Sequence, residues 1–169
     1  MKPTLKAGIV LGLLVVVWTF VMGVTGWYKD PSLLNLFYIV VLIEIAVLFW
    51  GLRLTAKEGK GYGAQLGAGT LMSVYGAVII FFGSLLFTTV VYPHYFEELR
   101  VMGEEVLRAR GVPEDQIKAQ LDLAASMQTP FMQALIGAVM TVVTGFVASL
   151  VLAAFLRAKG TPPEPAPSA

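Results

Sequence analysis

Four long apolar segments constrain the fold of this chain more than any other feature. They cover approximately residues 6–27, 33–52, 64–92 and 131–156. The hydrocarbon core of a bilayer is about 30 Å thick, and a helix of about 20 apolar residues crosses it. Lipid offers the backbone no hydrogen-bond partner, and the segments lack the alternating pattern of barrel strands. Each segment is therefore predicted to be a transmembrane helix.

Composition supports a membrane location. The chain is 57% hydrophobic and 14% charged, whereas a soluble domain is about half apolar and about a quarter charged. A small soluble core cannot bury such an excess of apolar surface. The chain has no cysteine, which excludes disulfides and thiolate metal sites.

Basic residues predict the orientation of the four spans. They lie before the first span, between the second and third, and after the fourth: Lys2, Lys6, Arg53, Lys57, Lys60, Arg157 and Lys159. Short basic segments stay in the cytoplasm, so both termini are expected there. We therefore predict an all-α membrane protein with four transmembrane helices and an N-in, C-in topology.

The segment at about residues 94–129 then faces the extracytoplasmic side and is predicted to form a helical hairpin. Apolar residues recur in it at helical spacing, Gly111 stands where a helix would stop, and Pro113 begins the second helix. Thr129 and Pro130 are expected to cap and open the fourth span. These parts form a four-helix membrane domain of residues 1–159. The proline-rich tail, residues 160–169, is expected to be disordered.

The N-terminal sequence MKPTLKAGIVLGLLVVV also admits an alternative, a cleaved signal peptide. Its apolar run exceeds the roughly 7–15 residues of a signal h-region, so we favour a first membrane span. Cleavage would leave the sidedness of the other three spans unchanged.

Small residues recur every four positions in the third and fourth spans. The two series are Gly69, Ser73 and Ala77, and Gly137, Thr141, Gly145, Ser149 and Ala153. Small side chains let helix backbones approach closely and gain dispersion contacts. Both series predict helix–helix seams. Packing within one four-helix monomer is the simpler interpretation, and a seam to a second subunit is the alternative.

Glu44 is a lone carboxylate near the middle of the second span. Its neighbours on the helix face are Val and Leu, and Arg53 lies nine residues away, roughly 13 Å along the helix. An ionised group there would lack a counter-ion at a cost of several kcal/mol. We expect a protonated Glu44, hydrogen-bonded to polar side chains at similar depth. The candidates are Tyr75, Thr19, Thr141 and Thr144.

Three roles for Glu44 stay open at this stage. It can fix helix register as a buried hydrogen-bonding group, which is the simplest role. It can exchange its proton while an ion or solute crosses the membrane. It can also contact a partner subunit or a lipid.

The sequence carries little other chemistry. The glycines of EGKGYGAQLGAG match neither a Walker loop nor a dinucleotide-binding turn. His94, the single histidine, could bind a metal only together with Glu97 and Glu98, and we favour an interfacial role for it. We expect no catalytic residues, no metal, no cofactor, and neither a nucleotide nor a nucleic acid as partner.

The chain resembles a family of bacterial four-span membrane proteins, domain of unknown function 4199. The resemblance is carried by IVLGLLVVVW, GLR, GYGAQLGAGTLMSVYGAVI and EELRVMGEEVLRARGVPEDQIKAQLDLAASMQTPFMQAL. It implies a bacterial inner-membrane protein with four helices and no assigned activity.

These features together favour a small, non-enzymatic protein that acts by association within the lipid bilayer. It would be a homo-oligomer or an accessory subunit of a larger inner-membrane complex. The alternative is a proton-linked carrier or channel centred on intramembrane Glu44.

Overall fold

The computed structural model describes residues 1–30 and 32–156. Arg157, Lys159 and the predicted tail at residues 160–169 lie outside this range. The elements follow in the order α1 (Pro3–Thr25), η1 (Trp27–Lys29), η2 (Leu34–Tyr38), α2 (Ile39–Ala56), α3 (Tyr62–Leu86), η3 (Phe87–Val91), α4 (Tyr95–Ala109), α5 (Glu114–Met127) and α6 (Pro130–Leu156).

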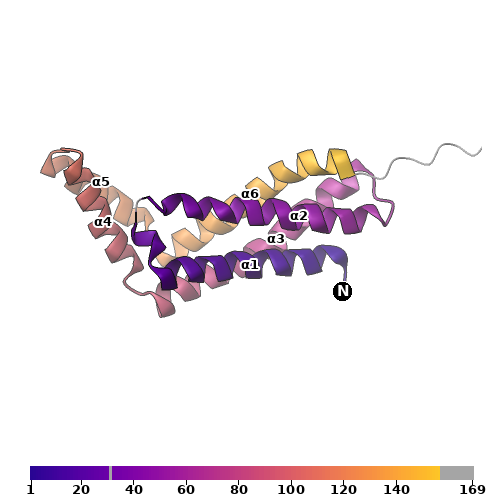
Figure 1. The fold of residues 1–169 in the computed structure, drawn as a ribbon, viewed down its shortest axis with the longest axis horizontal. Coiled ribbons are helices and arrows are strands. Elements are labelled where there is room, and N and C mark those ends of the chain that lie inside the picture. The colour runs from indigo at the N-terminus through magenta and orange to yellow at the C-terminus, as the bar shows by residue number, and fades with distance from the viewer. Residues whose placement is uncertain (31, 157–169) are drawn as a thin grey trace, which may run out of the picture.

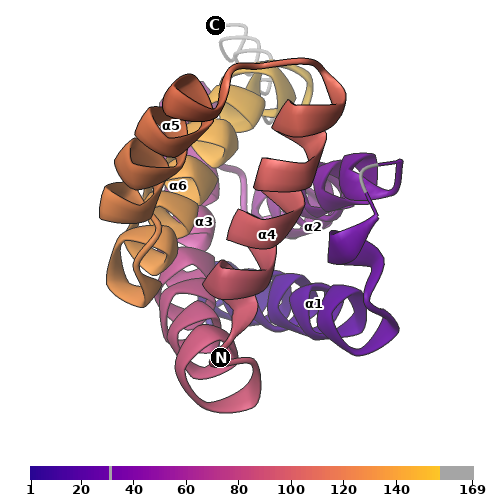
Figure 2. The ribbon, with the colours of Figure 1, turned by 90° about the vertical axis from the view of Figure 1, so that its left-hand side faces the viewer.

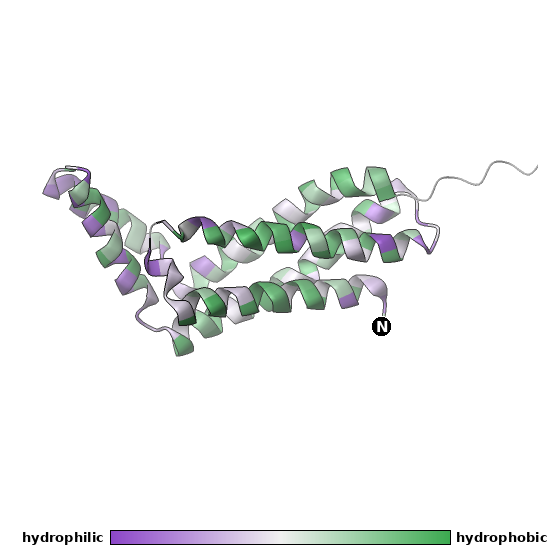
Figure 3. Cartoon of the chain, in the orientation of Figure 1, coloured by the Kyte–Doolittle hydropathy of each residue, from purple (hydrophilic) through white to green (hydrophobic). Residues whose placement is uncertain are grey.

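Four of these helices are long and apolar enough to cross a membrane. They cover Pro3–Thr25, Asn35–Ala56, Tyr62–Val91 and Pro130–Leu156. Each overlaps one of the segments that the sequence predicts. Their apolar side chains colour these helices mainly green in Figure 3, while the hydrophilic residues concentrate in α4, α5 and the connecting turns. The fold is consistent with a multi-pass membrane protein.

The four long helices form one bundle with two distinct ends. In Figure 1, α1 and α2 lie side by side, and the N-terminus and the end of α6 lie at the same end of the bundle. This end also contains the turn of residues 57–61 between α2 and α3, and we call it the loop end. The opposite end carries α4 and α5, and we call it the hairpin end.

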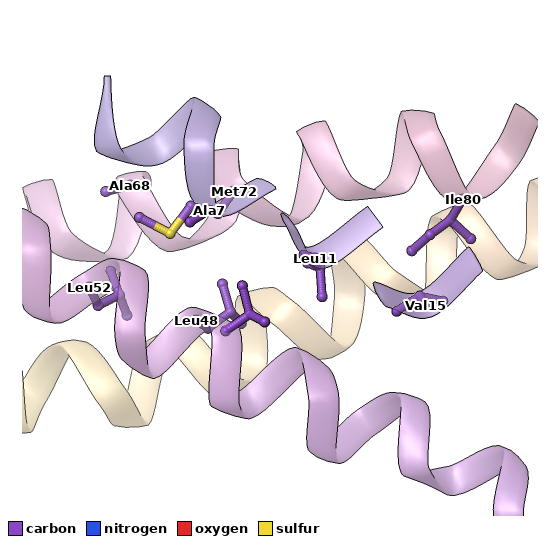
Figure 4. Close-up of a cluster of buried hydrophobic side chains, with 9 residues drawn as sticks. Ala7, Leu11, Val15, Leu48, Leu52, Ala68, Met72 and Ile80 are labelled. Carbon is purple, nitrogen blue, oxygen red and sulfur yellow. The ribbon is translucent and has the colours of Figure 1, made fainter. Parts of the chain in front are cut away.

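The apolar core joins three of the helices. Figure 4 shows buried side chains from α1, α2 and α3 that face one another, namely Ala7, Leu11, Val15, Leu48, Leu52, Ala68, Met72 and Ile80, and Val47 belongs to the same cluster. By contrast, many large apolar side chains on the outer faces of the helices stay exposed, among them Leu42 and Phe82. Exposed apolar faces of this kind suit helices that are surrounded by lipid.

The small-residue series lie in a seam between α3 and α6, which pack against each other more extensively than any other pair of elements. A methyl group added to Gly69 would overlap Ser149, and one added to Gly145 would overlap Ser73. Each serine thus lies against a glycine of the other helix. The structure places both series inside one chain.

Gly137 differs from the other members of its series. Nothing in the described part of the chain outside its own helix lies within 4 Å of a methyl group built there. Glycine is therefore not needed at this position for helix packing.

The sequence predicted that the third span continues to about residue 92. In the structure, the regular α-helix ends at Leu86. The last turn of the span, η3, is π-helical, and the amide of Tyr92 donates to the Phe87 carbonyl at 2.7 Å. Hydroxyls of this turn compete for carbonyls at the end of α3: Thr88 donates to the Ser84 carbonyl at 2.9 Å, and Thr89 to that of Leu85 at 2.6 Å. Such side-chain bonds disturb the regular helix ladder.

The hairpin end follows the predicted local signals. Gly111 has a positive φ of 72°, the left-handed conformation typical of a helix stop, where glycine carries no steric cost. The amide of Met132 donates to Thr129 Oγ1 at 3.2 Å, so Thr129 caps α6 as predicted. Figure 2, which looks onto this end, shows α4 lying across the end of the bundle.

Candidate functional site

Glu44 is the centre of the candidate site. Its side chain is only 3% exposed and lies where α2, α3 and α6 meet. Thr144 Oγ1 donates to Glu44 Oε2 at 2.5 Å, and Ser73 Oγ donates to Oε1 at 3.4 Å. No ion pair in the described ranges includes Glu44. The carboxyl group therefore has two hydroxyl partners and no cation.

Gly145 provides the space for this carboxyl group. A methyl group built on Gly145 would lie 2.7 Å from Glu44 Oε1 and would overlap Ser73. The close approach of α3 and α6 and the Glu44 site therefore depend on the same small residue. The sequence predicted the helix seam and the Glu44 site as separate features, whereas in the structure both lie at Gly145.

The structure brings only one of the four predicted partners to Glu44. Thr144 contacts it, whereas Thr19 donates to the Val15 carbonyl at 3.0 Å and Thr141 to the Gly137 carbonyl at 2.9 Å. Tyr75 lies against Gly8 of α1. These three side chains form no hydrogen bond with Glu44 in the described structure.

Ser73, predicted as a packing residue, is the second partner. The available signal was depth, because Glu44 and Ser73 lie at similar distances along the chain from the turn of residues 57–61. A serine in a small-residue series can pack and donate a hydrogen bond at the same time.

Thr144 can serve both protonation states of Glu44. Its hydroxyl lies 2.5 Å from Glu44 Oε2 and 2.8 Å from the Met140 carbonyl oxygen. A threonine hydroxyl has one proton to donate and two lone pairs to accept. When Glu44 is ionised, Thr144 donates to it. When Glu44 is protonated, Thr144 can donate to Met140 and accept from the carboxyl group. The arrangement can hold and release one proton.

A cavity of about 150 Å³ occupies the hairpin-end half of the bundle. Its lining comes from every long helix and includes the polar residues Thr19, Tyr28, Ser84, Thr88, Tyr95, Gln133 and Thr141. None of the described residues that line it is charged. Apolar side chains make up most of the lining, and these polar residues lie among them. The volume is large enough for several water molecules.

The cavity extends to within one helical turn of Glu44. Val40 lines it from α2, four residues before Glu44, and Thr141 lines it from α6, three residues before Thr144. One turn of α-helix corresponds to about 5.4 Å. The hairpin-end half therefore offers space close to the carboxyl group.

An aromatic cluster forms the hairpin-end wall of this cavity. Tyr28, Phe87 and Tyr95 are buried there, and the Tyr28 and Tyr95 rings lie 5.1 Å apart. The Tyr28 hydroxyl donates to Glu98 of α4, and Lys29 Nζ lies 3.0 Å from Glu98 Oε1. These contacts attach the start of α4 to the bundle above the cavity.

The ionisation states of Glu98 and Tyr28 follow from the groups that surround them. The hydrogen bond from Tyr28 and the nearby ammonium group of Lys29 hold the pKa of Glu98 below its ordinary value. Burial, with the Glu98 carboxylate in addition, raises the pKa of Tyr28. Glu98 is therefore ionised and Tyr28 is neutral at physiological pH.

A second polar group lies toward the loop end. Thr55 Oγ1 lies 2.6 Å from Gln65 Oε1, and Gln65 Nε2 donates to the Leu52 carbonyl at 3.2 Å. Both side chains are fully buried. Thr55 and Gln65 were not predicted as a polar pair from the sequence, although they flank the turn of residues 57–61.

Metal-ligating side chains do not gather in the part of the chain that the structure describes. No group of three or more His, Cys, Asp or Glu residues there could hold a metal ion. His94 Nδ1 lies 3.2 Å from Glu97 Oε2, and both side chains are largely exposed. Glu98 contacts Tyr28 and Lys29 instead.

The fold and the site together define a class: an all-helical chain with four helices suited to a membrane and one buried carboxyl group between them. The chain belongs to the family described as "Protein of unknown function (DUF4199)", whose model matches residues 6–158. Comparison with curated proteins and with solved structures gave no match.

Proposed function

We propose that this protein binds and releases a proton at Glu44 and acts as a proton-linked carrier or channel. The observation that carries the proposal is the cavity with polar residues in its lining, which extends from the aromatic cluster to within one turn of Glu44. Water in this cavity would connect the carboxyl group to the hairpin end. An intramembrane acid in such a setting is typical of proton relays.

The chemistry of the carboxyl group supports this proposal. No basic group pairs with Glu44 in the described residues, so no counter-ion holds the carboxyl group in its ionised form. Thr144 can accept from the protonated form and donate to the ionised form. The site needs no rearrangement of its partners to change protonation state.

The proposed location is a bacterial inner membrane, with the loop end in the cytoplasm. Lys6, Arg53, Lys57 and Lys60 lie at or near the loop end, and short basic segments stay in the cytoplasm. Lys6 Nζ also lies 5.7 Å from the centre of the Trp50 ring, as expected of side chains at a membrane interface. The hairpin end would then face the extracytoplasmic side, and a proton would enter from there.

Proton flux in proteoliposomes tests the proposal. Protein reconstituted into vesicles with a pH-sensitive dye inside should carry protons after a pH step, and Glu44→Gln should abolish this flux. Glu44→Asp should retain part of it, because a carboxyl group is present on a shorter side chain. Glu58→Gln is the matched control, since Glu58 pairs with Lys60 at 2.9 Å in the exposed turn. Equal flux through the wild type and Glu44→Gln would overturn the proposal.

Association is a second candidate function, favoured by the surface of α4 and α5. Val101, Leu123 and Met127 are exposed there, with Leu123 at 69%. This apolar surface would suit a homo-oligomer or another membrane subunit, without any enzymatic activity, metal, cofactor or nucleotide. Gly69, Ser73, Gly145 and Ser149 pack against one another inside one chain, so these residues do not support a seam to a partner.

The mass of the purified protein in mild detergent tests association. An oligomer or a co-purifying membrane subunit is expected, and Leu123→Ser should weaken it. Gln116→Ser, on an exposed position of the same helix, is the control. A strict monomer without any co-purifying protein would contradict this second candidate.

A further inference from the structure

Ser149 has an unusual hydroxyl group. Its Oγ is fully buried and has no hydrogen-bond partner in the described ranges. Five threonines of the spans behave differently, because each donates to the carbonyl four residues before it: Thr19, Thr70, Thr88, Thr141 and Thr144. Buried polar groups normally have a partner. The Ser149 hydroxyl is thus left free for another one.

Ser149 lies between the two polar groups of the bundle. It lies against Gly69 of α3, one helical turn from Ser73 on one side and one turn from Gln65 on the other. Ser73 contacts Glu44, and Gln65 contacts Thr55 near the loop end. Ser149 therefore fills the interval between the Glu44 site and the loop-end polar group.

We propose that Ser149, together with Gln65 and Thr55, forms a second proton route that connects Glu44 to the loop end. This inference rests on the proposed function of Glu44. Steps of one helical turn are too long for direct hydrogen bonds, so each would need one water molecule between the side chains. Those waters would enter when α3 and α6 separate at Gly69, and they would then be the partners of the Ser149 hydroxyl.

The transfer along this route needs no other reactant. Glu44 gives its proton to a water molecule, and that water passes a proton to Ser149 Oγ as Ser149 releases its own proton to the next water. One O–H bond forms and another breaks at the same oxygen. Gln65 and Thr55 position the last water by hydrogen bonding.

The two halves of the bundle differ in a way that fits a carrier. The hairpin-end half contains the cavity, whereas Ser149, Gln65 and Thr55 are fully buried in the loop-end half. Glu44 therefore lies between a half that contains a cavity and a half that is closely packed. Passage of a proton to the loop end requires α3 and α6 to separate slightly at Gly69.

Ser149→Ala in the proteoliposome assay tests this route. We expect a proton flux about tenfold lower, the effect of one lost hydrogen bond on the barrier. Thr70→Val is the matched control and should keep the wild-type flux, because the Thr70 hydroxyl already donates to the Leu66 carbonyl of its own helix. Ser149→Gly removes the same hydroxyl and serves if Ser149→Ala does not fold.

The outcomes separate the two proposals. Loss of flux in Glu44→Gln with normal flux in Ser149→Ala would overturn the loop-end route and leave the role of Glu44 standing. An equal loss in Thr70→Val would also overturn it, because the effect would then be a general loss of packing. Normal flux in Glu44→Gln would overturn both. A merely structural Ser149 would change the melting temperature without changing the flux.

Discussion

At the scale of single residues, Gly145 explains why a carboxyl group fits between three helices. A side chain at this position would take the space of Glu44 Oε1 and Ser73. Packing and protonation chemistry therefore meet at one glycine, and the same residue should control both stability and the state of Glu44.

Gly145→Ala should lower the free energy of unfolding by about 1–3 kcal/mol, the usual cost of overpacking. Gly137→Ala on the same helix should change it by less than about 1 kcal/mol, because the added methyl group meets no neighbouring element in the described structure. Thermal unfolding of both variants in detergent measures the difference. Equal melting temperatures would show that Gly145 is not a close contact.

Thr144→Val tests the hydrogen bond to Glu44 at the same scale. The variant keeps the side-chain shape and removes the hydroxyl, so stability should fall by about 0.5–1.5 kcal/mol. The infrared carboxyl band of Glu44 should also shift, because its donor is lost. Thr141→Val should leave that band in place, since Thr141 donates to the Gly137 carbonyl. A band that does not move in Thr144→Val would exclude this contact.

The sequence predicted part of this site and missed the rest for a physical reason. A lone acid among aliphatic residues is visible in any sequence, so Glu44 stood out. Which hydroxyls meet it depends on the rotation of each helix about its axis. Depth along the chain leaves that rotation undetermined, so Thr19, Thr141 and Tyr75 were predicted together with Thr144, and Ser73 was placed with the packing residues.

At the scale of elements, the start of α4 is attached to the bundle by Glu98. Its pKa is lowered by the hydrogen bond from Tyr28 and by Lys29. A carboxyl group with a lowered pKa in the folded state contributes stability above its ordinary pKa of about 4. That contribution is lost as the pH falls through the lowered folded value.

Acidification below about pH 4, or the substitution Glu98→Gln, should therefore loosen α4 over the cavity. Hydrogen exchange at the backbone amides of α4 should become faster, while α3 and α6 stay protected. Glu114→Gln is the control, since Glu114 pairs with Arg108 within the hairpin at 2.7 Å. Unchanged exchange in Glu98→Gln would show that other contacts hold α4.

The sequence predicted elements better than contacts. The spans, the stop at Gly111 and the cap at Thr129 depend on local composition and local hydrogen bonds, and the structure has them. The π-helical turn at Phe87–Val91 was missed. It depends on a balance between threonine side-chain bonds and the regular helix ladder, which the apolar pattern does not report.

At the scale of the whole molecule, the two ends of the bundle differ in structure. The hairpin end covers a cavity, and the loop end buries a polar group behind closely packed serines and glycines. A proton that enters at one end and leaves at the other must pass Glu44. The asymmetry between the halves predicts unequal access to Glu44 from the two sides.

Infrared titration of isotope-labelled Glu44 in oriented vesicles tests this central claim most directly. With the hairpin end facing outward, a protonated carboxyl band is expected at pH 7. This band should respond rapidly to a change of external pH and more slowly to a change of internal pH. A Glu44 that stays ionised at pH 7, or that responds to neither side, would contradict the account.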